Sequence, residues 1–195
     1  MKKYAFIVSF LVLLIVSARA LNAQNVAVKT NVLYGATTTP NLSVEMALGI
    51  KTTLDLQGTY NPFTFHDNKK LRHWSVQPEL RFWLCEKFTG GFFGLHAHHG
   101  VFNVGGIRLP LEIYPGLKDH RYQGHATGGG FSYGHQWYLG PHWNIEAQFG
   151  FGYTYVDFDR YECHKCGEQL GSGHKHYFGP TKMGISLIYL FKSKK

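Results

Sequence analysis

The cysteines and histidines near the C-terminal end of the chain have types and spacing that could do chemistry. Cys163 and Cys166 are spaced CxxC, and His174 and His176 follow a Gly-Ser-Gly stretch. Two thiolates and two imidazoles suit a tetrahedral Zn²⁺ site, because a CxxC turn lets both sulfur atoms face one ion. A disulfide between Cys163 and Cys166 would instead rigidify a loop of an exported protein. The spacing leaves both interpretations open.

A second group of histidines lies mid-chain. In an extended strand, His96 and His98 share one face and His99 lies on the other. A metal or acid-base site could form there, but histidines that line a barrel interior beside Glu79 and Arg81 explain the pattern more simply. The chain has 12 histidines, and several are expected on or beside loops at one end, which suggests a surface binder of metal or haem: His66, His73, His120, His164, His174 and His176.

Catalysis is not predicted. His120 with Asp119 and His66 with Asp67 could serve as base and carboxylate, but each pair is adjacent in sequence, a poor geometry for a base held by its orienting group. No nucleophile elbow supplies a serine. We therefore expect a non-enzyme with no catalytic residues and no cofactor beyond the open question of Zn²⁺.

The N-terminal segment has the order of a secretory signal. Lys2 and Lys3 precede an apolar run over residues 5–16, and small residues then lead to Ala23. We expect a signal peptide over residues 1–23, Sec-type export with cleavage near Ala23, and one domain over residues 24–195. Without the leader, 17 basic and 12 acidic side chains remain, a net charge near +5 with no clustered basic stretch, so nucleic-acid binding is not expected.

Period-two alternation of apolar and polar residues positions the remaining groups. It is plainest over residues 74–84 and 143–155 and predicts strands with one apolar and one polar face. No later apolar run approaches the length of a membrane helix, so strands would have to make any membrane crossing. We predict eight strands, near residues 26–36, 41–49, 52–61, 73–84, 90–102, 121–139, 142–157 and 180–191, joined alternately by tight turns and by longer loops at 37–40, 62–72, 103–120 and 158–179.

An even number of strands with alternating short and long connections is typical of bacterial outer-membrane barrels. The predicted fold is an all-β, eight-stranded antiparallel up-and-down transmembrane β-barrel of OmpA/OmpX-like architecture. A soluble lipocalin-like barrel would turn its apolar face inward. Aromatic residues gather at the predicted strand ends, as expected of girdles at the lipid headgroups: Tyr34, Tyr60, Trp74, Phe102, Tyr122 and Tyr155 at one end and Trp83, Trp137, Tyr138, Trp143, Tyr189 and Phe191 at the other.

The polar faces of the predicted strands carry charges. In a barrel interior filled by side chains these charges must pair, which predicts an ionic core and no wide pore. They are Lys29, Glu45, Asp55, Glu79, Arg81, Glu146 and Lys182. Pro78 removes a hydrogen bond from its predicted strand, so we expect a bulge there. Cys85 is left over at the tight-turn end, where we expect a buried or unpaired thiol.

Four segments of the chain also resemble a known group of proteins: residues 29–40 (KTNVLYGATTTP), 60–65 (YNPFTF), 77–86 (QPELRFWLCE) and 161–167 (YECHKCG). They are similar to an uncharacterised domain-of-unknown-function family of small outer-membrane proteins of anaerobic Gram-negative bacteria. The resemblance implies the barrel and its location in the outer membrane, and it hints at partners in surface-fimbria systems. It carries over no catalytic residue.

These observations together predict an outer-membrane barrel with a structural or surface-interaction role, whose outer loops are the recognition surface. Its expected partners are outer-membrane lipid and surface or fimbrial proteins. Two alternatives are a metal- or haem-linked surface binder that uses Cys163, Cys166, His174 and His176, and a lipid-modifying barrel enzyme, which would need a catalytic group at the rim.

Overall fold

The chain forms a closed barrel of eight antiparallel strands in which each strand pairs with its neighbour in sequence and β8 closes against β1. The computed structural model describes residues 26–64, 70–106, 120–162 and 168–191. The strands are β1 (Val26–Asn31), β2 (Asn41–Ala47), β3 (Thr52–Asn61), β4 (Lys70–Trp83), β5 (Gly90–Gly105), β6 (His120–Tyr138), β7 (Trp143–Glu162) and β8 (Gln169–Phe191). The 3₁₀ helix η2 (Val32–Thr37) follows β1. The predicted all-β barrel is confirmed.

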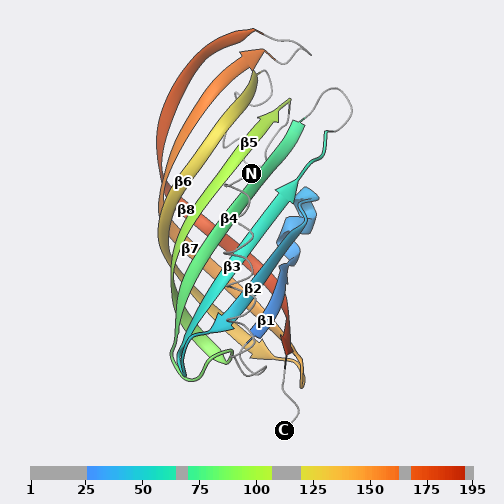
Figure 1. Ribbon diagram of the computed structural model, residues 1–195, viewed down its shortest axis with the longest axis vertical. Coiled ribbons are helices and arrows are strands. Elements are labelled where there is room, and N and C mark those ends of the chain that lie inside the picture. Colours follow the sequence, from blue (N-terminus) through green and yellow to red (C-terminus); the bar gives the residue numbers. More distant parts are fainter. Residues whose placement is uncertain (1–25, 65–69, 107–119, 163–167, 192–195) are drawn as a thin grey trace, which may run out of the picture.

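The two ends of the barrel differ. At one end, here called the turn end, short connections join β2 to β3, β4 to β5 and β6 to β7. At the other, here called the loop end, β5 to β8 extend well beyond β1 and β2 (Figure 1). The strands lengthen from 6 residues in β1 to 23 in β8. The rim of the loop end is therefore oblique, with a wall of sheet on the side of β6, β7 and β8.

Alternation sets what lies inside and outside. Along β7, Asn144, Glu146 and Gln148 are buried in the interior, whereas Trp143, Phe149 and Phe151 are exposed on the outer surface. The same inversion holds in β4, where Arg81 is 1% exposed and Phe82 is 49% exposed. The barrel therefore has polar side chains inside and an apolar outer face.

The interior is layered. At the turn end it is apolar: Trp83 packs on Phe92 and Phe88 with ring centroids 4.8 and 6.1 Å apart, and Ile188 and Ala27 complete the cluster. Trp83 is only 3% exposed, so its assignment to an outer aromatic girdle was wrong. Phe102 and Tyr122 also fall on the lumen-facing alternation of β5 and β6.

Two further predictions need correction. No bulge forms at Pro78: the register between β4 and β5 is the same at Val76↔His99 and at Glu79↔His96, and only the pairs at Gln77 and Pro78 are missing. The loop expected over residues 158–179 is mostly strand, because β7 continues to Glu162 and β8 begins at Gln169. The β7–β8 ladder instead has a register shift between Gly150 and Phe151, opposite Lys182 and Pro180.

Candidate functional site

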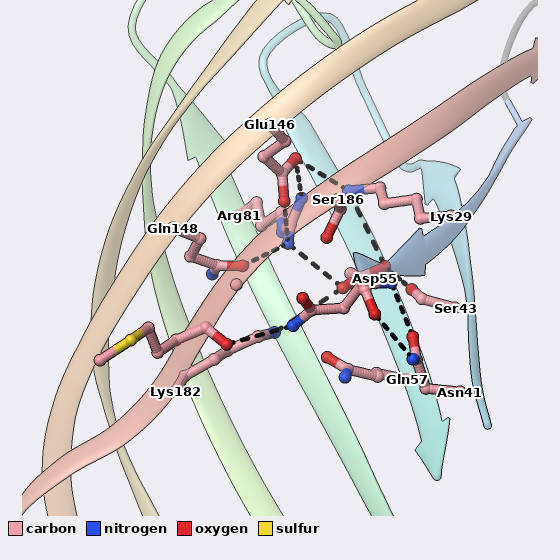
Figure 2. Close-up of a pocket in the computed structure, with 13 residues that line it drawn as sticks. Lys29, Asn41, Ser43, Asp55, Gln57, Arg81, Glu146, Gln148, Lys182 and Ser186 are labelled. Carbon is pink, nitrogen blue, oxygen red and sulfur yellow. Dashed lines mark hydrogen bonds and ion pairs between the residues drawn. The ribbon is translucent and has the colours of Figure 1, made fainter. Parts of the chain in front are cut away.

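The barrel interior is closed by a buried cluster of charged side chains, here called the ionic plug. Its cations come from β1, β4 and β8, and its carboxylates from β2, β3, β4 and β7. Figure 2 shows the three cations with Asp55 and Glu146. Its members are Lys29, Glu45, Asp55, Glu79, Arg81, Glu146 and Lys182, the seven charges predicted to point inward, and all are buried. The predicted ionic core is confirmed.

Arg81 lies at the centre of the plug. Its Nε donates to Glu79 Oε2 at 2.7 Å and its Nη1 donates to Glu146 Oε2 at 2.9 Å. Nη1 also reaches Glu45 Oε2 at 3.1 Å and Nη2 reaches Asp55 Oδ2 at 3.2 Å. The guanidinium lies over the Phe92 ring, 4.4 Å from its centroid, which joins the plug to the apolar layer below. One planar group with five donors thus binds carboxylates from four strands.

The two lysines complete the charge pairing. Lys29 Nζ donates to Glu146 Oε2 at 3.1 Å and also contacts Glu45. Lys182 Nζ donates to Glu79 Oε2 at 2.9 Å and lies 3.7 Å from Asp55 Oδ2. Because buried charges are costly unless each is paired and hydrogen-bonded, this density of contacts is what allows the cluster to exist.

Neutral donors satisfy the carboxylates further. Thr53 donates to Glu45, Ser43 to Asp55 and Ser132 to Glu79 through their hydroxyl groups. Gln148 Nε2 donates to Glu79 Oε1 at 2.6 Å. Four carboxylates face three cations, and these donors help to stabilise the extra negative charge.

Little open space remains inside the plug. A small cavity is lined by residues of both charges and by Asn31, Asn41 and Ser186. It has room for about one water molecule. Gly94 faces the plug from β5, and a Cβ there would lie 2.8 Å from Glu79 Cδ, so a side chain at this position would push into the charges.

Toward the loop end, His96 and His98 face the interior and their rings stack with centroids 6.1 Å apart. His96 Nε2 lies 2.9 Å from Thr181 Oγ1, and His98 Nε2 lies 2.9 Å from Thr154 Oγ1. His99 lies on the outer face, 5.7 Å from Trp74 between ring centroids. The predicted division of the three histidines between the faces is confirmed.

Of the four predicted metal ligands at the C-terminal end, only His174 and His176 lie among the described residues. Cys163 and Cys166 lie outside the described residues, as do His66, Asp67, Asp119 and His164. His174 and His176 lie in β8 rather than in a loop, both exposed, with ring centroids 5.8 Å apart. Within the four described stretches, no group of three or more His, Cys, Asp or Glu residues is placed to hold a metal ion.

The remaining predicted site residues are placed singly. His120 begins β6 and is partly exposed, and His73 in β4 lies 3.2 Å, through Nδ1, from the carbonyl oxygen of Leu71. Cys85 lies in the turn between β4 and β5 as a free, exposed cysteine, so the thiol expected to be buried or unpaired is unpaired and not buried.

A closed eight-stranded barrel with a paired ionic interior and an apolar exterior is therefore the class that the fold and the site define. The chain belongs to the family described as "Protein of unknown function (DUF3575)", whose model matches residues 8–191. Comparisons with curated proteins and with solved structures found no match. Among the described residues, no helix is long and apolar enough to cross a membrane.

Proposed function

We propose that the mature chain is an integral outer-membrane barrel that conducts no solutes and presents the loop end of its wall as a recognition surface. The inverted distribution of side chains carries this proposal. Paired charges occupy the middle of the interior, while the exterior exposes a wide apolar band that includes Leu56, Leu95, Phe131, Phe149, Met183 and Ile185. Phe131 is 74% exposed, a fraction that favours lipid rather than water as its neighbour.

The height of the band fits a bilayer. On β7 the outward residues from Trp143 to Tyr153 are apolar or aromatic, a stretch of about 11 residues, which is what a tilted strand needs to cross a membrane. Trp137, Trp143 and Tyr189 lie on the outer face toward the turn end, as expected of an aromatic girdle.

The outer face changes character toward the loop end. Outside the apolar band it carries four histidines, here called the outer histidine belt: His99, His125, His174 and His176. His125 and His174 both pair across the sheet with Asp157. Polar and titratable side chains at this level support a boundary between lipid and water.

The ionic plug supports the absence of conduction, because paired charges lie across the interior and the cavity described among them has room for about one water. What remains accessible from outside is the oblique wall of β5 to β8. A recognition role for this wall is the function that the geometry supports best.

Single-tryptophan variants would test the membrane assignment. In vesicles that contain brominated lipid, fluorescence from a variant that retains only Trp143 should be strongly quenched, because this ring is 46% exposed on the apolar band. The matched control retains only Trp83, which is 3% exposed inside the barrel and donates from Nε1 to Thr53 Oγ1 at 2.9 Å. Equal quenching of the two variants, or none of either, would refute the proposal. Heat-modifiable gel mobility gives an independent test of the barrel.

A further inference from the structure

The outer part of β8 has an open edge. β1 pairs with β8 only from Ser186 to Phe191. Next to this ladder, the side chain of Asn31 replaces a strand as the hydrogen-bond partner of the β8 backbone. Its Nδ2 donates to Met183 O at 3.1 Å, and its Oδ1 accepts from Ile185 N at 3.3 Å. In the part of the chain that the structure describes, no strand pairs with this edge from Pro180 outward to Gln169 (Figure 1).

The direction of the backbone groups follows from Pro180. Proline has no N–H and is accepted within sheets where the N–H would point away from the ladder. Counting outward from Pro180 by twos, the backbone groups of Phe178, His176, His174 and Ser172 face the open side. The residues between them face β7. The open edge therefore offers a regular series of donors and acceptors.

The side chains along this edge are suited to a further strand. On the outer face, His176 packs on Tyr155 and Tyr153 with ring centroids 5.4 and 5.9 Å apart, and His174 lies 6.1 Å from Tyr155. These are cross-strand contacts between β7 and β8. A strand added on the other side of β8 would place its own outward residues beside the same two histidines.

We propose that the outer half of β8, residues 169–180, binds an extended segment of a partner protein by antiparallel strand addition, with aromatic and acidic residues of that segment against His174 and His176. This inference deepens the proposed recognition role by naming the partner's chemistry. The ladder would supply main-chain hydrogen bonds, and the histidines would select alternate side chains.

A second copy of the chain does not fit this edge. Two barrels upright in one membrane are related by an axis along the membrane normal, which makes the two β8 strands run in the same direction. Antiparallel pairing would require one copy to be upside down. This excludes antiparallel pairing of β8 with β8 of an upright second copy, and we assign the edge to a segment of a different protein.

The segment of β7 that already pairs with β8 defines a probe. Residues 153–160, with the sequence YTYVDFDR, pair with residues 171–178 in an established antiparallel register. A synthetic peptide of this sequence carries tyrosine and aspartate on the outward alternation. Its control is the same peptide N-methylated at alternate residues on the bonding edge, which removes the donors and keeps the side chains.

Amide hydrogen exchange on the mature barrel in nanodiscs tests the proposal. The amides of Ser172, His174 and His176 should exchange rapidly in the free protein and slow by roughly tenfold or more with the peptide, because new ladder hydrogen bonds protect them. The amides of Gly173 and Tyr177, which face β7, should be protected already. Protection of all five amides without peptide, or unchanged exchange at saturating peptide, would overturn the proposal.

Two variants distinguish the contribution of the backbone hydrogen bonds at the β8 edge from that of the histidine side chains. His174→Pro removes one N–H from the open side and should abolish peptide binding, whereas His174→Thr keeps the N–H and should weaken it only in part. Cross-linking that captured β8 against β8 of a second barrel would also overturn the proposal. A barrel that bound the peptide but failed the brominated-lipid test would keep strand addition at this edge, but it would lose the membrane assignment and with it the argument against a second copy.

Discussion

Arg81 is the residue on which the interior depends most directly. It bonds carboxylates that come from β2, β3, β4 and β7, and its ring contact with Phe92 joins two layers of the interior. Removing one partner from a buried charge network costs more than the network contributes in total, because the opposite charges remain buried and unpaired.

We therefore expect Arg81→Met to lower the free energy of unfolding by about 3–5 kcal/mol. Urea titration of the folded barrel in detergent micelles measures this loss. The control is Arg160→Met, since Arg160 is exposed near the outer end of β7 and its loss should stay within about 0.5 kcal/mol. Equal effects of the two substitutions would show that Arg81 does not hold the plug together.

At this scale the sequence predicts which charges enter the barrel but not how they pair. Alternation alone assigns Lys29, Glu79 and Lys182 to the interior, because the apolar residues near each of them lie on the opposite face of the same strand. The partners depend on the registers of strands distant in sequence: Lys29 reaches Glu146, 117 residues away. No local pattern contains that information.

Among the elements, β8 shows where sequence reasoning fails. Met183 and Phe178 are both exposed on the outer face, yet they lie an odd number of positions apart, which strict alternation would place on opposite faces. The register shift opposite Gly150 and Phe151 accounts for this by adding a residue at Thr181. A strict period of two therefore breaks there, and the Gly-rich, charged stretch beyond it was assigned to a loop.

Pro78 gives a prediction for β4. Its pairs with β5 are absent while its pair with Leu56 of β3 is kept, which indicates a lost ladder bond on the β5 side. Pro78→Val should restore an N–H donor and raise the free energy of unfolding by about 1 kcal/mol.

The matched control for this substitution is Leu80→Val, on the same outward face, where both ladder pairs are intact. It should give no gain in the same urea titration. A loss of stability in Pro78→Val would contradict this prediction, because it would show that the barrel is more stable with the β4–β5 ladder interrupted at Pro78.

For the molecule as a whole, the plug predicts an electrically silent barrel. Reconstituted in planar bilayers, the barrel should give no discrete conductance steps, because paired charges lie across its interior and the cavity described among them has room for about one water. A wide-pore porin in the same bilayer serves as the positive control. Regular steps that scale with salt concentration would contradict a closed interior.

The unequal lengths of the strands also bear on how the ring assembles. β7 and β8 pair over most of their length, from Trp143↔Tyr189 to Tyr161↔Gln169, and they are neighbours in sequence. The closing ladder between β1 and β8 is short and joins the first strand of the chain to the last. A hairpin of two strands that are neighbours in sequence closes a shorter loop of chain than the β1–β8 seam does, and its entropic cost is lower. We therefore expect the β1–β8 seam to form last and to open first. Lys29 of β1 donates across β8 to Glu146 of β7. This ion pair therefore holds the β1–β8 seam closed.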